Sequence, residues 1–350
     1  MREHFGANDP VAEYKIYNAE EARREFLCEG DCEGESVKGA FEYLAGSVSA
    51  YKFAVGILKM ALKKGLNLQT NTPVTEIQPL DGGRWRLHTP RGAIDTRNLI
   101  LATNGYTAHI LPELQSHIVP VRGQVTAQRP GSAIKRLAPS GIRTTVSFIY
   151  SNGYEYMIQR PYNNPYVPAE MAGDFIIGGG LRKLPQEGLS EIGEYDDTKV
   201  NTVNSQYLEK CLAGYYGRNW GEDNAGGRIR REWTGIMGFT PDELPFVGAV
   251  PGQKGVWVCA GFNGHGKLSY YVKEYFMLTV LIGMVLCLKS SAALIHMLME
   301  DPENAYSWFP DSFRITAQRL KSDICEVGNN VDHETPGPQD ADTAKAKSKL

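Results

Sequence analysis

Apolar residues recur at helical spacing in two early stretches of the chain. In 13–29, alanine, leucine and phenylalanine alternate with charged residues in the way that is typical of a surface helix. In 53–64, the apolar residues Val55, Leu58 and Leu62 share one side of a helix, and a glycine follows as a terminator. These patterns predict an N-terminal helical segment over 1–45 and a second helix near residue 60.

Strand-like patterns follow these helices. Short apolar runs at 66–70 and 74–77 predict strands, and alternating side chains about a Pro-Arg-Gly turn predict a hairpin over 84–96. The run Asn98-Leu-Ile-Leu-Ala-Thr-Asn-Gly is apolar and then breaks into small polar residues. That pattern is typical of a buried parallel strand whose carboxyl end faces a ligand, although a core strand before an ordinary turn explains it equally well.

The pattern changes after residue 118. Separated β-like runs at 119–126, 144–149, 154–159 and 174–179 precede a helical stretch at 202–215. They predict a second domain built on a sheet. Beyond about residue 322 the chain is rich in Asp, Glu, Lys, Pro and Asn and poor in apolar residues, which predicts a disordered tail over 321–350.

Composition narrows the class of partner. The 350 residues are 42% hydrophobic with a formal net charge of −3, so no global field attracts nucleic acid, and we expect a small-molecule partner. Of the six cysteines only Cys28 and Cys32 lie close together, without a second pair, so no metal site is predicted. Nothing in these numbers indicates an oligomeric state.

Targeting signals are sparse. The first ten residues have no apolar region behind a basic start, which argues against a secretory signal. The final Ser348-Lys349-Leu350 reads as a peroxisomal address. We therefore expect a cytoplasmic or peroxisomal protein.

Two segments near residue 250 carry the most specific signal. Trp233-Thr-Gly-Ile-Met-Gly-Phe-Thr-Pro-Asp-Glu-Leu-Pro-Phe-Val-Gly is followed by Gly255-Val-Trp-Val-Cys-Ala-Gly-Phe-Asn-Gly-His-Gly. The second segment predicts a strand over 256–260 that ends in a glycine-rich turn, where backbone amides approach a ligand without a Cβ clash. Glycines in such turns more often serve tight geometry alone, so the turn by itself is a weak motif.

Together, these two segments resemble the C-terminal flavin-binding signature of the D-amino-acid oxidase and sarcosine oxidase superfamily of FAD-dependent oxidoreductases. Other parts of the chain match in the same order, and the resemblance spans roughly 12–320. The matching parts are Gly46 with its helix, Thr72-Pro-Val-Thr-Glu-Ile, Leu101-Ala-Thr-Asn-Gly-Tyr, Val119-Pro-Val-Arg-Gly-Gln, Tyr154 to Arg160 and Ile176-Ile-Gly-Gly-Gly.

The resemblance implies an α/β, two-domain flavoprotein that holds FAD. A Rossmann-like FAD domain would be assembled from 46–110 and 233–320, and 111–232 would form a substrate domain with a mixed or antiparallel sheet. The implied reaction is oxidation of a small amine or amino acid by hydride transfer to the flavin, which dioxygen or another acceptor then reoxidises. Covalent or non-covalent attachment of the flavin stays open.

The resemblance also implies site residues. The cofactor-binding candidates are Val74, Ala102, Thr103, Asn104, Gly105, Gly235, Asp242, Gly261, Asn263, Gly264, His265 and Gly266. The substrate-side candidates are Arg122, Gln124, Tyr154, Tyr156 and Trp233. Lys183 and His265 are catalytic candidates, Lys183 because some relatives place a lysine over the flavin to assist oxygen. A surface ion pair for Arg122 and core packing for the two tyrosines are the ordinary alternatives.

The chain departs from this family pattern in two ways. No Gly-x-Gly-x-x-Gly follows an early strand, so we expect an FAD domain that lacks its first βαβ unit. Residues 267–283 look extra, and a retained intron explains them if Gly266-Lys267 is encoded by GGT-AAG. The genomic sequence tests that hypothesis.

Two functional alternatives follow from these departures. The first alternative is an inactive truncated relative, or a binding protein without flavin. A membrane-tethered protein that uses 276–298 is the other alternative, but the mainly apolar run over 276–288 is shorter than the roughly 20 residues that span a bilayer. A helix packed against the flavin domain fits this run better.

Overall fold

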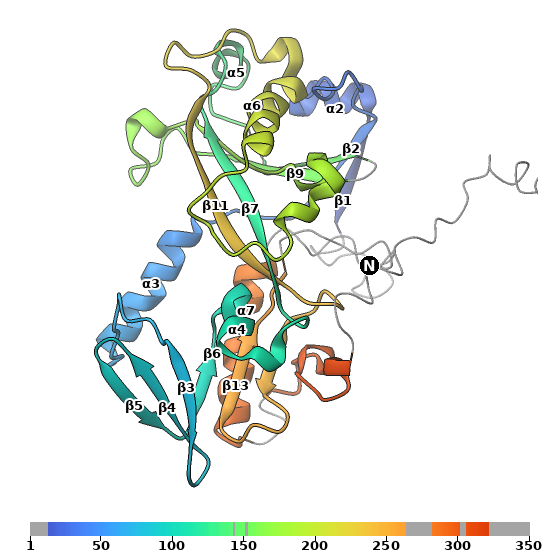
Figure 1. The fold of residues 1–350 in the computed structure, drawn as a ribbon. Coiled ribbons are helices and arrows are strands. Elements are labelled where there is room, and N and C mark those ends of the chain that lie inside the picture. The colour runs from blue at the N-terminus through green and yellow to red at the C-terminus, as the bar shows by residue number, and fades with distance from the viewer. Residues whose placement is uncertain (1–12, 143, 151–152, 264–281, 302–305, 322–350) are drawn as a thin grey trace, which may run out of the picture.

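The computed structural model describes residues 13–142, 144–150, 153–263, 282–301 and 306–321 (Figure 1). Within them the chain is a mixed α/β protein with four sheets. The segment predicted as extra, 267–283, and the candidates Gly264, His265 and Gly266 lie almost entirely outside the described residues, as does the predicted tail.

A five-stranded antiparallel sheet forms the upper body in Figure 1. Its order is β11-β7-β10-β9-β8, with β7 Val119–Gln128, β8 Val146–Tyr150, β9 Gly153–Gln159, β10 Phe175–Gly179 and β11 Ile229–Phe239. Helix α6 Thr202–Tyr216 covers one face, where Phe175 and Ile177 pack against Leu208 and Leu212 in a core whose members are at most 8% exposed. The strand and helix predictions for 119–215 are confirmed.

The N-terminal part contains more than a helix. Strands β1 Tyr14–Asn18 and β2 Gly39–Tyr43 pair as an antiparallel ribbon around α2 Ala19–Phe26, whose first turn has a capping box between Asn18 and Glu21. We predicted helix throughout 13–29, but 14–18 is a strand. Its partner lies some 25 residues further along, and pattern analysis within one window does not detect such a pairing.

Two smaller sheets form the lower body. One contains β3 Glu76–Leu80, β4 Arg84–Thr89 and β5 Gly92–Thr96, which confirms the predicted hairpin. The other has the order β12-β13-β6, from β12 Phe246–Ala249, β13 Val256–Ala260 and β6 Leu99–Leu101, and β13 and β6 run parallel. The strand expected at 66–70 is wrong, because that segment forms turn and irregular backbone.

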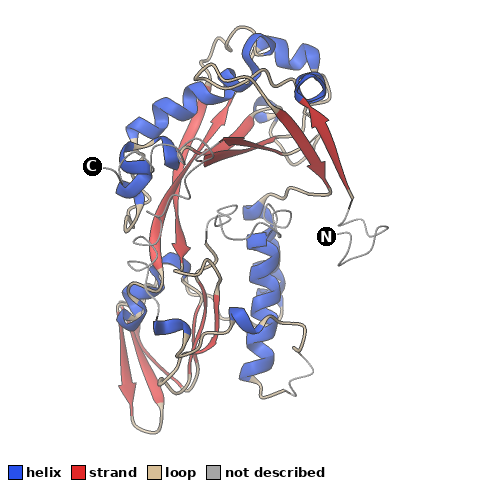
Figure 2. Ribbon diagram, turned by 90° about the vertical axis from the view of Figure 1, so that its right-hand side faces the viewer, coloured by secondary structure: helices blue, strands red, loops and turns tan. Residues whose placement is uncertain are grey.

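The remaining helices connect or cover these sheets (Figure 2). The α-helices are α3 Ala50–Lys63, α4 Thr107–Ile110, α5 Ser132–Leu137 and α7 Ile282–Leu298. The short 3-10 helices are η2 Asn104–Tyr106, η3 Pro112–Leu114, η4 Ala169–Met171, η5 Leu181–Lys183, η6 Pro185–Glu191, η7 Gly217–Asn219, η9 Asp311–Phe313 and η10 Arg319–Lys321. Among the described helices none combines the length and apolarity that a bilayer crossing needs.

The long strands β7 and β11 join the upper and lower bodies. They pair over nearly their full lengths, from Val119 opposite Phe239 to Gln128 opposite Ile229, and η2 packs on the lower end of β11. The expected domain boundary at 232/233 falls inside β11. The backbone hydrogen bonds between β7 and β11, irregular only between Ile229 and Arg231, therefore connect the predicted substrate domain to the predicted FAD domain.

Candidate functional site

The carboxyl ends of the parallel strands β6 and β13 are tied together by Asn104. Its side-chain Oδ1 accepts hydrogen bonds from the backbone N–H of Gly261 at 3.0 Å and of Phe262 at 3.2 Å. Asn104 has a positive φ of 45°, which asparagine tolerates better than most residues. The two strand-end turns, predicted separately from sequence, thus form one junction.

Asn263 ties the same junction to the loop between β11 and β12. Its N–H donates to the carbonyl of Gly238 at 2.7 Å, and its Oδ1 accepts from the N–H of Thr240 at 2.9 Å. Its amide Nδ2 donates to the carbonyl of Gly261 at 2.9 Å. Because Thr240 is 2% exposed, these bonds satisfy backbone groups that water does not reach.

Glycine is required where these segments cross. A Cβ at Gly238 would lie 2.8 Å from both Asn104 Oδ1 and the N of Gly105. A Cβ at Gly261, which has a φ of 75°, would lie 2.6 Å from the Thr240 methyl group. Gly238 and Gly261 therefore serve close backbone approach.

The upper sheet presents a second group of candidates on the face opposite α6. Tyr156, Gly178, Val125 and Trp233 lie side by side in one row across β9, β10, β7 and β11. Trp233 is 38% exposed and Tyr156 is 37% exposed. No atom of the described residues lies within 4 Å of where a Cβ at Gly235 would stand. In the part of the chain that the structure describes, this face is an open platform with two aromatic side chains and a gap beside them.

Arg122 and Gln124 lie on the other face of the same sheet. Arg122 is 8% exposed, and its Nε donates to Glu191 at 2.7 Å while its Nη1 donates to the carbonyl of Asp196 at 3.2 Å. Burial raises the pKa of Glu191, but its hydrogen bonds with Arg122 and Asn201 outweigh burial and hold that pKa below its ordinary value. The structure therefore does not bring Arg122 together with Tyr156 and Trp233.

Gln124 has an equally defined environment. Its Nε2 donates to the Ser205 hydroxyl at 2.9 Å, and its Oε1 accepts from the N–H of Asn201 at 2.9 Å. Asn201 is the N-cap of α6, and its side chain accepts from the first turn of that helix. In this structure Gln124 positions the start of α6.

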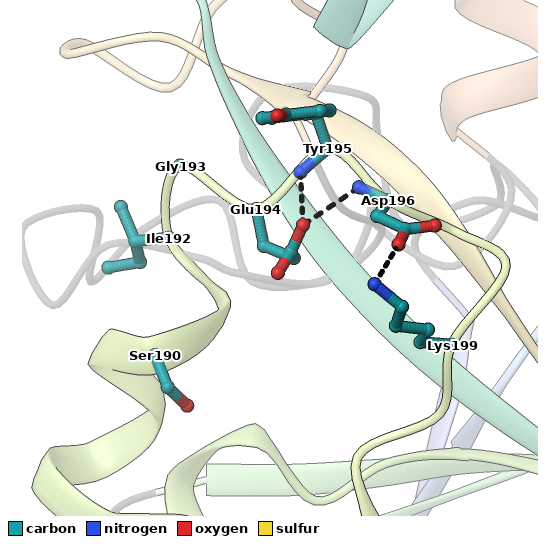
Figure 3. A pocket seen from close by; sticks show the side chains of 7 residues that line it. All are labelled: Ser190, Ile192, Gly193, Glu194, Tyr195, Asp196 and Lys199. Atoms are coloured by element: carbon teal, nitrogen blue, oxygen red, sulfur yellow. Dashed lines mark hydrogen bonds and ion pairs between the residues drawn. The ribbon is translucent and has the colours of Figure 1, made fainter.

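A hollow of about 510 Å³ lies beside the segment 190–199, which includes Asp196, a contact of Arg122 (Figure 3). It is lined by Ser190, Ile192, Gly193, Glu194, Tyr195, Asp196 and Lys199. Glu194 accepts from the N–H groups of Tyr195 and Asp196, and Asp196 pairs with Lys199 at 2.8 Å. Glu194 also lies 3.6 Å from Arg122 Nη1, so both acidic side chains already have partners in the protein and the hollow gives no sign of a ligand.

The remaining described candidates are dispersed. Lys183 Nζ lies 2.8 Å from both carboxylate oxygens of Glu33 and 4.5 Å from the centre of the Tyr150 ring. Val74 is half-buried ahead of β3, Ala102 is exposed, and the Thr103 hydroxyl bonds that of Thr107 at 2.9 Å. Tyr154 is half-buried, and its burial raises its pKa.

Two residues of the junction were missed by the sequence reasoning. Thr240 follows Phe239 and precedes Pro241-Asp242, so the Thr-Pro-Asp turn was its available signal. Arg319, which pairs with Asp242 through two bonds of 2.7 and 2.8 Å, lies 77 residues away in sequence. No local pattern links it to the junction.

Comparison with known proteins places this geometry in context. The family model for DAO, "FAD dependent oxidoreductase", matches residues 2–271. Among curated proteins, the probable oxidoreductase OrdL of Rhizobium meliloti is 24% identical over 232 residues, which is 66% of this chain and 46% of that protein. The mitochondrial dimethylglycine dehydrogenase of Rattus norvegicus is 24% identical over 229 residues, which is 63% of this chain and 24% of that protein.

Solved structures agree on the fold. Glycine oxidase from Geobacillus kaustophilus superposes with a TM-score of 0.57 at 20% identity, covering 87% of this chain and 67% of that one. Iminodiacetate oxidase from Chelativorans sp. BNC1 gives a TM-score of 0.58 at 17% identity, covering 86% and 67%. The chain spans less than half the length of the two curated relatives named above.

Proposed function

The chain belongs to the DAO family of FAD-dependent oxidoreductases, and on that basis we propose that it oxidises a small amine or amino acid with bound FAD. The observation that carries the proposal is the junction at the ends of β6 and β13. There Asn104 and Asn263 hold a glycine-rich turn at the carboxyl ends of two parallel strands, which is where α/β sheets bind their ligands.

The residues present fit one end of FAD. The gap beside Gly235 and the exposed aromatic rings of Trp233 and Tyr156 offer the flat, largely apolar surface that suits a planar ring or a small substrate. The sequence contains no Gly-x-Gly-x-x-Gly turn, so no residue is assigned to the pyrophosphate. The affinity for FAD is therefore the first quantity to measure.

Each part of this arrangement has a role in the proposed reaction. When bound, FAD supplies the hydride acceptor. Trp233 and Tyr156 would orient the substrate and exclude water from its amine, which favours the neutral, reactive amine. Asn104 and Asn263 would keep the turn rigid, so that its position is set before the ligand arrives.

A flavin titration tests the proposal. FAD is added to the purified 350-residue chain, and binding is followed by absorption and by quenching of tryptophan fluorescence. Saturable binding, followed by bleaching of the flavin when small amines and amino acids are added without oxygen, is the expected result. A folded chain that leaves FAD unbound would instead support a binding protein without flavin, or an inactive relative.

A matched pair of variants separates substrate from cofactor. Trp233→Ala removes an aromatic side chain from the platform, so we expect slower bleaching with unchanged FAD affinity. Trp85→Ala is the control, because Trp85 lies in the separate β3-β4-β5 sheet and bonds the carbonyl of Lys254. Equal loss of bleaching in both variants would argue against the platform as the substrate side.

A further inference from the structure

Arg319 makes an unusually complete set of contacts with the loop between β11 and β12. Its Nε and Nη2 donate to the two carboxylate oxygens of Asp242 at 2.7 and 2.8 Å. Nη2 also donates to the carbonyl of Leu244 at 2.9 Å, and Nη1 to that of Pro245 at 2.9 Å. The guanidinium carbon lies 4.2 Å from the centre of the Phe246 ring. Asp242, Leu244, Pro245 and the first residue of β12, Phe246, thus all contact one side chain.

A short path of hydrogen bonds leads from Arg319 to the flavin junction. The carbonyl of Leu244, which accepts from Arg319, also accepts from the Thr240 hydroxyl at 2.8 Å. The N–H of Thr240 in turn donates to Asn263 Oδ1 at 2.9 Å. Leu244 and Thr240 therefore link Arg319 to Asn263, whose side chain holds the glycine-rich turn.

The loop needs such an external support. Glu243 has a positive φ of 59°, a conformation that a residue with a side chain keeps only when its surroundings impose it. The side chain of Arg319 is 13% exposed, so its bonds are partly shielded from water. Lysine cannot replace it, because a single ammonium lacks the planar fork that reaches a carboxylate and two carbonyls together.

We propose that Arg319 is a positioning residue for the flavin site. It holds loop 240–245 in the conformation in which Thr240 anchors Asn263, and it thereby sets the affinity of the glycine-rich turn for FAD. This inference rests on the proposed function. It assigns a part in cofactor binding to a residue outside the matched range 2–271.

The test compares Arg319→Lys with the unaltered chain in two measurements. Hydrogen exchange without FAD reports the N–H groups of Thr240 and Asn263, and titration reports the FAD dissociation constant. Loss of charge-assisted bonds of this kind predicts exchange faster by about tenfold and FAD binding weaker by about tenfold. Arg86→Lys is the matched control, because it disrupts another two-bond Arg–Asp pair, with Asp95 at 2.7 and 2.8 Å, in the β3-β4-β5 sheet.

Two further variants guard against a simple folding defect. Asp242→Asn keeps the arginine and its carbonyl bonds. We therefore expect faster exchange and weaker FAD binding in this variant too, but by smaller factors than in Arg319→Lys. In Arg319→Ala, added guanidinium at tens of millimolar is expected to restore part of the FAD affinity, which a general loss of stability would not allow.

The outcomes are distinct. An Arg319→Lys protein that binds FAD as tightly as the unaltered chain, or that exchanges at Thr240 and Asn263 at the unaltered rate, overturns this inference alone. A folded unaltered chain that fails to bind FAD overturns the proposed function and this inference together. Weakened binding with faster exchange in Arg319→Lys, and neither change in Arg86→Lys, supports it.

Discussion

The ring of Tyr156 occupies the space that a side chain at position 178 would fill. The two residues are directly opposite in β9 and β10, and a Cβ on Gly178 would lie 2.5 Å from the tyrosine oxygen. The orientation of Tyr156 over the platform thus depends on the absence of a side chain on the neighbouring strand.

Gly178→Ala is expected to displace Tyr156 and to lower the free energy of unfolding by about 1–3 kcal/mol, the usual range for overpacking. Urea denaturation measures this change. Gly235→Ala is the control on the same face, since its new Cβ would meet no atom of the described chain within 4 Å. The double variant Gly178→Ala with Tyr156→Ala should recover most of the loss, and no recovery would show that the clash is not with Tyr156.

Asn104→Ala is expected to lower the free energy of unfolding by about 2 kcal/mol, because it leaves the N–H groups of Gly261 and Phe262 without their acceptor. Asn104→Asp keeps an acceptor oxygen and tolerates the positive φ, so it should retain more stability. Thermal and urea unfolding of both variants provide the measurement. Equal losses would mean that the side-chain oxygen is not what joins the two strands.

The protonation of Glu155 makes the free energy of unfolding depend on pH. It is 0% exposed, and burial raises its pKa above the ordinary 4.5, although hydrogen bonds from Tyr215, Tyr150 and Tyr207 oppose that rise. The folded state therefore binds this proton more tightly than the unfolded state. Its contribution to stability is complete below pH 4.5 and is lost as the pH rises through the folded pKa.

The variant Glu155→Gln, which carries no ionisable group, should lose this dependence. Urea unfolding between pH 4 and pH 8 compares the two proteins. We expect the unaltered chain to lose stability relative to the variant as the pH rises. A gain relative to the variant would contradict a raised pKa.

The cysteines should differ in their reaction with iodoacetamide. Cys28 is buried, and burial raises its pKa to about 12, so little reactive thiolate forms at pH 8. Cys32 is exposed. Peptide mass spectrometry should find Cys32 labelled well before Cys28, while urea-unfolded protein labels both at similar rates. Early labelling of Cys28 in the folded chain would place it nearer the surface than the structure does.

Much of the fold was accessible from the sequence because its signals are local. The apolar runs at 99–101 and 256–260 are each followed by a turn of small or polar residues, and they form β6 and β13. The β-like runs at 119–126 and 154–159 predicted β7 and β9 in the same way. Each of these strands is specified within one short window.

The relations between segments were not accessible. The pairing of Tyr14 with Tyr43 converts an apparent helix start into a strand, and the bond from Arg319 to Asp242 spans 77 residues. The face on which Arg122 lies also depends on tertiary structure, because alternation along β7 gives two sides without saying which one α6 covers. Such relations require the packed chain.

The alternation of side chains along β11, paired with β7, fixes which residues lie on the platform side and which lie on the side of η2. Trp233 and Gly235 lie on one side of β11. Ile236 and Gly238 lie on the other side, where η2 packs. Because side chains alternate, deleting one residue from the middle of β11 would exchange the two sides along the rest of the strand. Deleting two would preserve the sides but shift the platform one step toward the junction. The distance along β11 between the platform and the junction can therefore change only in steps of two residues if each side chain is to keep its side.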